Sequence, residues 1–519
     1  MHISLPTSST ARGPTTPTEG DDMSDSASGT GIPAAGHTAG VHRPASGAVV
    51  AVLAFAGIVV ALMQTLVVPL LPELPGLLHA SASDTSWVIT ATLLAGAVAT
   101  PVTGRLGDMY GKRRVLLLSL GLLVVGSLVC AFTSSLVPMV VGRALQGGAT
   151  GVIPLGISIM RDELPAERLG SAMALMSSSL GIGGALGLPS AALIAQHADW
   201  HALFYTSAGL GVAAMALVLF LVPESPVRTP SRFDVPGAIG LSVGLVCLLL
   251  AISKGGDWGW ASGTTLGLVA AAVVVLVGWG MFELRTTAPL VDLRTTARPQ
   301  VLLTNIASVM AGFSLFAMSL VLPQLLQLPE ETGYGLGRSM LVAGLCLAPS
   351  GLVMMAVSPL SARISAARGP RVSLMIGMAV VAVGYGLGLF LTHAVWQVVV
   401  VASVIGCGIA LAYAAMPALI MGAVPLAETA AANGLNTLMR SIGTSSSSAV
   451  VGVILAHMTT SYHGAPLPSL SGFRVAFAVA CGAAVAALFI AAFIPARHVR
   501  ATGGGAAKVP APAPADEPV

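Results

Sequence analysis

The chain has 519 residues, of which 55% are hydrophobic and only 9% are charged, and its formal net charge is +3. A soluble domain carries about 25% charged residues, so this composition excludes an ordinary soluble protein and predicts an integral membrane protein with short loops. The small net charge and the lack of a basic patch with interleaved aromatic residues argue against a nucleic-acid partner.

The two ends of the chain, residues 1–46 and 496–519, are rich in Ser, Thr, Gly, Pro and Ala. Segments of this kind cannot bury enough apolar surface to fold alone, so we expect two disordered tails. The first tail does not look like a cleaved signal peptide, because the apolar run that follows it, 48–71, is too long and lacks a convincing cleavage site.

Between these tails, apolar runs recur that are close to the length of about 20 residues that a helix needs to cross a bilayer. They show no period-two pattern, so all are predicted to be helices. The fourteen predicted spans are 48–71, 86–104, 115–133, 137–158, 171–195, 203–222, 235–254, 263–282, 300–325, 339–360, 371–391, 396–421, 431–456 and 473–494.

The positive charges fall mainly on one side of these spans. Of the 24 Lys and Arg residues, 19 lie on the side that holds both tails, 3 lie on the other side and 2 lie within spans. Cytoplasmic loops of membrane proteins carry an excess of Lys and Arg. The pattern predicts a multi-pass protein of the cell membrane with both termini in the cytoplasm.

Cofactors and catalytic domains are not expected. The five cysteines lie singly in apolar runs and are interpreted as free, buried side chains rather than as disulfides or metal ligands. No loop is large enough for a catalytic domain, and the chain has no G-x-x-x-x-G-K-[ST] sequence. We therefore predict neither an enzyme nor an ATP-driven pump.

The most informative segment is 104–114, Gly-Arg-Leu-Gly-Asp-Met-Tyr-Gly-Lys-Arg-Arg, which follows the second span. We expect a tight cytoplasmic loop, because glycines let two helix ends approach closely. A single carboxylate among four cations suggests a charge lock between moving parts. The site residues predicted in this segment are Gly104, Gly107, Asp108, Gly111, Lys112 and Arg113.

Arg143 lies inside the fourth span, and Gln146 shares its helix face at i+3. A charged side chain at that depth is costly unless it is paired or faces a water-filled cavity. We interpret the two residues as candidates for a proton relay or a substrate gate. The alternative is a structural arginine that reaches the nearer membrane surface or binds backbone carbonyls.

The thirteenth span carries a polar stripe of Asn433, Asn436 and Arg440 at i, i+3 and i+7. This stripe is a candidate gate and cavity lining, although a solvated helix end would show the same pattern. Asn305 and Gln64 are uncharged polar residues within other spans, and they fit either a substrate cavity or a contact between helices.

Two of these segments resemble motifs of the major facilitator superfamily. Residues 104–114 are similar to its loop motif G-x-L-a-D-r-x-G-r-r, with Met109 where a cation is usual, and Val-Gly-Arg-Ala-Leu-Gln-Gly-Gly around Arg143 is similar to its second motif. A weak echo of the loop motif at 359–371 keeps glycine and cations but has no carboxylate. Two related halves are typical of transporters with a site near the membrane midplane.

Fourteen spans with these motifs resemble the EmrB/QacA-type drug:proton antiporters over residues 48–495. The resemblance implies an all-α major facilitator fold. It divides the chain into an N-terminal six-helix half (47–222), two additional helices (223–299) and a C-terminal six-helix half (300–495).

The fifth span resembles the antiporter motif of these exporters, in which glycines and a Gly-Pro step bend the helix. The matching residues are Gly181, Gly184, Gly187 and Pro189. Leu188 stands where the family has proline, and the proline follows one position later. The alternative is a generic contact between small residues of two helices.

The first span departs further from the family, because Met63 occupies the position where many members carry an acidic residue. No Asp or Glu lies well inside any predicted span. Proton coupling through a carboxylate at the membrane centre is therefore not evident from this sequence.

The resemblance implies a secondary exporter of hydrophobic or amphipathic drugs, driven by protons and working by alternating access. We expect it to work as a monomer and to bind a small-molecule substrate, protons and the bilayer. One alternative is a dedicated exporter of a single metabolite made by the cell. Another is a receptor or scaffold that does not transport, although a scaffold has no need of the retained Asp108.

Overall fold

The structure is a computed structural model that describes residues 46–67, 70, 73–225, 227–228, 232–462 and 465–495. The two predicted tails, 1–46 and 496–519, lie outside the described residues apart from Ser46.

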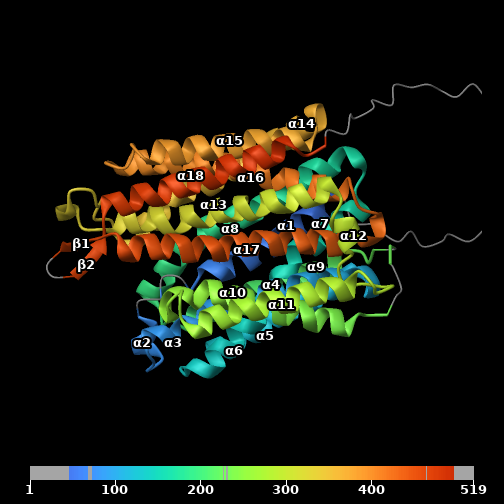
Figure 1. Ribbon diagram of the computed structural model, residues 1–519, viewed down its shortest axis with the longest axis horizontal. Helices are drawn as coiled ribbons and strands as arrows, with labels where there is room; N and C mark the ends of the chain where they lie inside the picture. Colours follow the sequence, from blue (N-terminus) through green and yellow to red (C-terminus); the bar gives the residue numbers. More distant parts are fainter. Residues whose placement is uncertain are drawn as a thin grey trace, which may run out of the picture. The chain divides into compact units, whose positions relative to one another are not determined.

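The described chain is mainly helical, with one two-stranded antiparallel hairpin (Figure 1). The elements are α1 (Ser46–Thr65), α2 (Leu74–Leu77), α3 (Ala82–Thr85), α4 (Trp87–Tyr110), α5 (Lys112–Ala131), α6 (Leu136–Gly147), η2 (Gly148–Gly151), α7 (Val152–Glu163), α8 (Ala166–His197), α9 (Ala202–Leu221), α10 (Val235–Trp258), α11 (Gly263–Glu283), α12 (Leu293–Thr296), α13 (Pro299–Gln327), η3 (Glu330–Thr332), α14 (Met340–Arg368), α15 (Pro370–Gly388), α16 (Val395–Met421), η4 (Leu426–Glu428), α17 (Thr429–His457), β1 (Thr459–Tyr462), β2 (Ala465–Pro468) and α18 (Leu470–Ala492).

Fourteen helical spans of the described chain are long and apolar enough to cross a membrane, which confirms the predicted number. In lipid a helix satisfies its own backbone hydrogen bonds, so the apolar runs become helices whatever their exact sequence. Some boundaries differ from the predictions. The fourth span consists of α6 and α7 joined by the 3₁₀ turn η2, and α8 extends well beyond the predicted 171–195.

The expected loop at 104–114 is a single-residue turn, and this prediction of a longer loop is wrong. Helix α4 continues through Asp108 to Tyr110, and α5 begins at Lys112. Only Gly111 separates them. Its backbone φ is +112°, a conformation that residues with a Cβ rarely adopt. Gly369 makes the corresponding turn between α14 and α15 with φ of +88°.

These two turns define one end of the helix bundle, which we call the glycine-turn end. Figure 1 shows β1 and β2 at the opposite end, the hairpin end, together with the short helices α2 and α3. Helix α1 begins and α18 ends at the glycine-turn end, where Arg371 donates a hydrogen bond to Ala492 O (2.5 Å).

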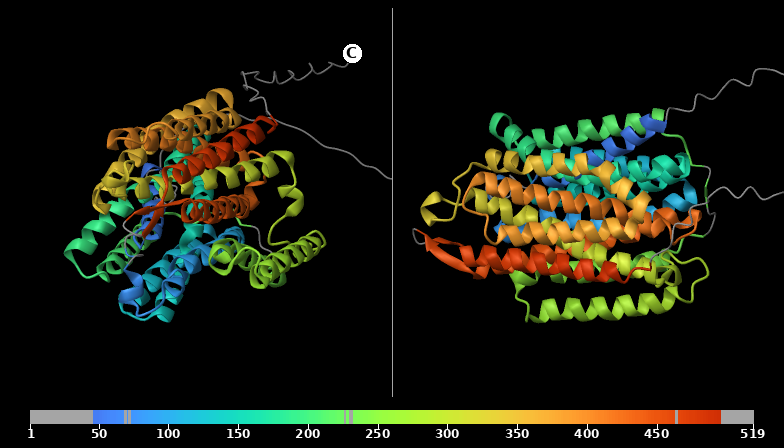
Figure 2. Two further views of the ribbon diagram at one scale, coloured as in Figure 1. Left: turned by 60° about the vertical axis from the view of Figure 1, so that its left-hand side comes forward. Right: turned by 90° about the horizontal axis from the view of Figure 1, so that it is seen from above.

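The helices differ in how far they are buried within the bundle. The most apolar stretch of α16 is 72% buried, whereas that of α11 is 11% buried, so α16 is central and α11 is peripheral. Both views of Figure 2 show α10 and α11 together at the margin of the bundle. The principal contacts between the helices before α10 and those after α11 pair α8 with α14 and α4 with α17.

The turn at Gly111 yields a test that separates backbone strain from crowding. A Cβ at Gly111 would lie 2.6 Å from Glu224 Oε1, whereas a Cβ at Gly369 would meet nothing within 4 Å. We expect Gly369→Ala to destabilise the protein by about 1–3 kcal/mol through its positive φ alone. Gly111→Ala should destabilise it more, and the apparent unfolding temperature of purified protein in detergent measures both effects.

Gly121→Ala is the matched control for these two variants, since it lies inside α5 with open space around it. Alanine is a better helix former than glycine, so this variant should be neutral or slightly stabilised. Equal unfolding temperatures for all three variants would contradict the strained turn.

Candidate functional site

The buried carboxylate Asp108 binds the beginning of another helix. Its side chain is 1% exposed. Its Oδ2 accepts a hydrogen bond from Ala431 N–H (2.9 Å) and its Oδ1 accepts one from Ala430 N–H (3.3 Å). These are first-turn amides of α17, which have no partner within their own helix and carry partial positive charge. Asp108 therefore attaches α4 to the N-terminus of α17.

Gly104 lies one helical turn before Asp108 on the same face of α4. A Cβ at this position would lie 2.6 Å from Ala430 O, so only glycine lets α17 approach this closely. The glycine and the carboxylate thus serve one contact between the two helices.

Lys112 connects Asp108 to a second carboxylate that the sequence analysis missed. Its fully buried Nζ lies 2.5 Å from Asp162 Oδ2 and 3.9 Å from Asp108 Oδ1. Asp162 also accepts a hydrogen bond from Ser225 Oγ (2.5 Å). A buried lysine requires such partners. Asp108 is therefore not a lone carboxylate, because Asp162 at the end of α7 shares its cation.

Arg161, beside Asp162, forms a second bridge to the later helices. Its guanidinium donates hydrogen bonds to Thr429 Oγ1 (2.6 Å) and to Met421 O (2.9 Å). It therefore holds the end of α16 and the beginning of α17 together. The sequence signal for this residue was its position in a charged triplet, Arg-Asp-Glu, at the end of a span.

Gly107 and Arg113, two further predicted residues of the 104–114 segment, contact α7 and the end of α9. Arg113 donates its backbone N–H to Glu224 Oε1 (3.3 Å) and its guanidinium to Leu219 O. A Cβ at Gly107 would collide with Leu155 of α7. Gly107 and Arg113 thus attach α4 and α5 to α7 and to the end of α9, not to α17.

Arg143 is 2% exposed and binds two neighbouring helices, α1 and α4, and Gln146 of its own helix α6. Its Nε donates to Val88 O (3.2 Å), and one terminal nitrogen donates to Gln146 Oε1 (2.6 Å) and lies 3.4 Å from both Met63 O and Met63 Sδ. These partners are all uncharged. The position where the family resemblance implies an acidic residue, Met63, is therefore in direct contact with the buried guanidinium.

Gln146 extends this arrangement to α5 and α9. Its Nε2 donates to Ser127 Oγ (2.7 Å), and Ser127 Oγ lies 3.0 Å from Ser207 Oγ. Arg143 and Gln146 lie together, as their spacing predicted, in a buried polar network. Arg143 binds backbone carbonyls of α4 and α1, as the structural alternative expected.

The stripe on α17 is also buried. Arg440 is 7% exposed and donates to Asn436 Oδ1 (2.9 Å) and Thr437 Oγ1 (2.8 Å). Asn436 Nδ2 donates to Asn305 Oδ1 (2.9 Å) on α13. Asn433 donates to Thr429 O (3.0 Å) within α17. The structure thus brings three of the predicted residues, Arg440, Asn436 and Asn305, into one connected polar chain.

The predicted helix-bend residues line a contact face of α8. This helix is continuous from Ala166 to His197, with Pro189 inside it. Gly181 and Gly187 lie so close to Met354 and Thr65 that a Cβ would collide with them, whereas Gly184 has nothing within 4 Å. Thr65 belongs to α1, next to the half-buried Gln64. The small residues therefore let α1 and α14 pack closely on α8.

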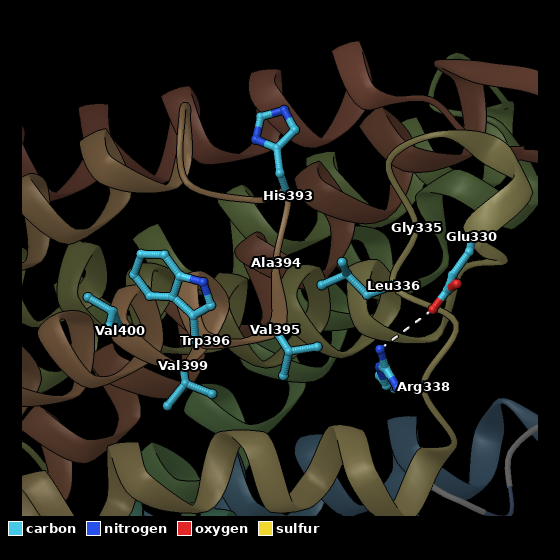
Figure 3. Close-up of a pocket in the computed structure, with 10 residues that line it drawn as sticks. All are labelled: Glu330, Gly335, Leu336, Arg338, His393, Ala394, Val395, Trp396, Val399 and Val400. Carbon is cyan, nitrogen blue, oxygen red and sulfur yellow. Dashed lines mark ion pairs between the residues drawn. The ribbon is translucent and has the colours of Figure 1, made fainter.

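Two hollows lie away from the predicted residues. The larger, of about 960 Å³, is an open groove at the hairpin end beside the start of α16, where Arg338 and Glu330 form an ion pair of 3.5 Å (Figure 3). The smaller, of about 490 Å³, lies at the glycine-turn end between α1, α8 and α14, with Arg168 in its lining. Neither is lined by a residue predicted as a site.

Comparisons with known proteins agree with these motifs. A family model described as Major Facilitator Superfamily matches residues 53–448. The tetracenomycin C resistance and export protein of Streptomyces glaucescens is 29% identical over 478 residues, which cover 88% of this chain and 86% of that protein. The probable multidrug resistance protein EmrY of Escherichia coli is 31% identical over 56% of this chain and 57% of its own length.

Solved structures show the same fold at low sequence identity. The human organic anion transporter MFSD10 has a TM-score of 0.64 at 16% identity, covering 86% of this chain and all of that chain. The proton:xylose symporter XylE has a TM-score of 0.59 at 14% identity, covering 87% of this chain and 96% of its own. Both likenesses support the all-α transporter fold.

The geometry of Arg143 predicts that its planar group, not only its charge, is required. A lysine cannot reach Val88 O and Gln146 Oε1 together as the guanidinium does. We expect Arg143→Lys to lower the free energy of unfolding by about 1–3 kcal/mol, since buried acceptors lose their donors. Arg114→Lys is the control, because Arg114 is 70% exposed and makes one ion pair. Equal stability of both variants in detergent would contradict the network.

Proposed function

This chain belongs to the Major Facilitator Superfamily, and from this membership we propose that it is a secondary exporter of hydrophobic or amphipathic drugs and antibiotics. It is a multi-pass membrane transporter and not an enzyme. The proposal is supported by relatives named for resistance and export, which include the multidrug resistance protein Stp of Mycobacterium tuberculosis, 27% identical over 74% of this chain and 71% of that protein.

The observation that carries the mechanism is the contact of Asp108 with the beginning of α17. It joins a helix of the proposed N-terminal half, 47–222, to a helix of the proposed C-terminal half, 300–495. Arg161 makes a second junction of the same kind. In alternating access, the glycine-turn end opens only when these hydrogen bonds break. We propose that these contacts hold this end closed.

We place the glycine-turn end in the cytoplasm, because most Lys and Arg residues lie at this end. Substrate then enters from the cytoplasm or the inner leaflet when the contact opens, and leaves at the hairpin end. One chain contains both proposed halves, so we propose the monomer as the transporting unit.

Protons are the proposed driving ions, and Asp108 is the proposed site of coupling. Proton binding to Asp108 removes the negative charge that faces the N-terminus of α17, and so weakens the closed contact. Arg143 and Gln146 are better suited to gating, because their partners at Met63, Val88 and Ser127 carry no readily exchanged charge. Arg143 and Gln146 link α6 to α1, α4 and α5, which all belong to the proposed N-terminal half and so would move together.

A second candidate function is the export of one metabolite that the cell makes for itself. The relative that covers 88% of this chain is named for resistance to, and export of, a single compound, tetracenomycin C. The mechanism would be the same, and the two candidates differ in the breadth of substrates.

Transport into inside-out membrane vesicles tests the proposal. We expect vesicles that contain the protein to accumulate the neutral dye Nile red when their interior is made acidic, and to lose this uptake when a protonophore collapses the pH gradient. Equal uptake by vesicles without the protein would contradict export. Uptake that requires the protein but persists without the pH gradient would contradict proton coupling and would leave the proposed export unaffected.

Asp108→Asn tests the proposed role of the contact between Asp108 and the beginning of α17. The amide nitrogen of asparagine cannot accept a hydrogen bond from α17, so one of the two contacts is lost. Loss of a charged hydrogen bond corresponds to about 1.5–3 kcal/mol, and we expect transport to fall about tenfold or more at unchanged expression.

Glu428→Gln is the matched control for this variant. Glu428 lies directly before α17 but makes no capping hydrogen bond to it. The same change of charge at the same helix end should therefore have a much smaller effect. Full transport by a well-expressed Asp108→Asn variant would rule out a role in transport for the contact between Asp108 and α17.

A further inference from the structure

The polar chain on α13 and α17 contains a buried positive charge, Arg440, that forms no ion pair with any described residue. Arg440 donates hydrogen bonds to neutral oxygens of Asn436 and Thr437, and its guanidinium lies 5.1 Å from the centre of the Tyr413 ring. Each of these partners is uncharged. A guanidinium has five N–H donors, so Arg440 retains capacity to bind a further acceptor.

The hydrogen bonds of Arg440 set the orientation of the next side chain. A guanidinium can only donate, so the amide oxygen of Asn436 must face it. The amide nitrogen of Asn436 therefore points the other way, where it donates to Asn305 Oδ1 (2.9 Å) and Ser308 Oγ (2.8 Å). Ser308 donates its own proton to Thr304 O (2.8 Å), which leaves its oxygen free to accept.

The orientation of Asn436 in turn sets that of Asn305. Because Asn305 must present its oxygen to Asn436, its nitrogen is left over as a donor. Asn305 is 3% exposed, and within the described part of the chain its Nδ2 has no hydrogen-bond partner. An unpaired buried donor costs about 1–3 kcal/mol. The chain thus begins with an unneutralised cation and ends with an unsatisfied donor.

Resting on the proposed export function, we propose that Arg440 and Asn305, oriented by Asn436, bind an anionic, hydrogen-bond-accepting group of the exported molecule, such as a carboxylate or phenolate. The remaining N–H donors of Arg440 and the unpaired Nδ2 of Asn305 each suit such an oxygen, and the Tyr413 ring lies next to the Arg440 guanidinium. Asn433 Oδ1, one helical turn away, is a buried acceptor without a partner among the described residues, which fits a hydroxyl next to the anionic group.

The charges of the other spans favour the same class of substrate. Arg143, like Arg440, lies well inside its span and binds neutral partners. The carboxylates within the spans lie near the span ends, as Asp108 and Glu283 do, and Met63 occupies the position of the expected acidic residue. A transport path with buried arginines and no central carboxylate should favour anionic and neutral molecules over cations.

Three anthracenes of similar size test this preference. They carry a carboxylate, a hydroxymethyl or an aminomethyl group at the same ring position, and so are anionic, neutral and cationic at neutral pH. Binding to the full-length protein in lipid nanodiscs and uptake into inside-out vesicles are both measured. We expect the carboxylate to bind about tenfold or more tightly than the aminomethyl compound, as a charge-assisted hydrogen bond implies.

Two variants identify the residues responsible. Arg440→Gln removes the charge but retains an amide, and should weaken carboxylate binding about tenfold while changing hydroxymethyl binding less than about twofold. Asn305→Asp replaces the open donor with a carboxylate oxygen, and should reverse the preference in favour of the aminomethyl compound. Arg363→Gln is the control, because Arg363 is an exposed arginine on α14.

The outcomes separate this inference from the proposed function. Equal binding of the carboxylate and aminomethyl compounds, or an unchanged preference in Arg440→Gln, would overturn the anion site even if the hydroxymethyl compound is exported. Arg440-dependent carboxylate binding without uptake of any compound would support the site and overturn export. Hydroxymethyl binding by both variants shows that they are folded.

Discussion

The first amides of α17 have no acceptor within their own helix, and a carboxylate from α4 supplies one. Water is scarce at such a buried helix end, so the acceptor must come from protein. Glu428 directly precedes α17 but makes no capping bond, which leaves this role to Asp108. Gly104 permits the close approach, and Lys112 forms an ion pair of 3.9 Å with the carboxylate. The spacing of Gly104, Asp108 and Lys112 in the sequence thus follows from a single contact, that of α4 with the beginning of α17.

The membrane explains why the number of spans was predictable from sequence and why several helix ends were not. Any apolar run of sufficient length becomes a helix in lipid, and the predicted fourteen spans are present. The charged residues after 104 suggested a loop. Asp108 and Lys112 are nevertheless helical, because each finds its partners on α7 or α17. Tertiary contacts, which the sequence does not display, stabilise these charged helix ends.

The candidate sites were predictable where partners share a helix. The spacing of Arg440, Asn436 and Asn433 correctly placed them on one face. The contact of Arg143 with Met63 joins residues 80 positions apart, and that of Asn436 with Asn305 joins residues 131 positions apart. No local pattern encodes such pairs. Arg161 and Asp162 were missed for the same reason, although their position at a span end was a usable signal.

The margin of the bundle has a consequence for the surrounding lipid. Helix α10 packs on both α4 and α17, and the apolar cluster there includes Leu241 and Leu245 of α10 with Leu435 and Leu438 of α17. Helix α11 contacts mainly α10 and otherwise faces outward. When α4 and α17 separate, acyl chains could enter the opening between them. Helix α10 covers this seam and α11 packs outside it, so in the proposed alternating access these two helices would keep the opening sealed against the bilayer.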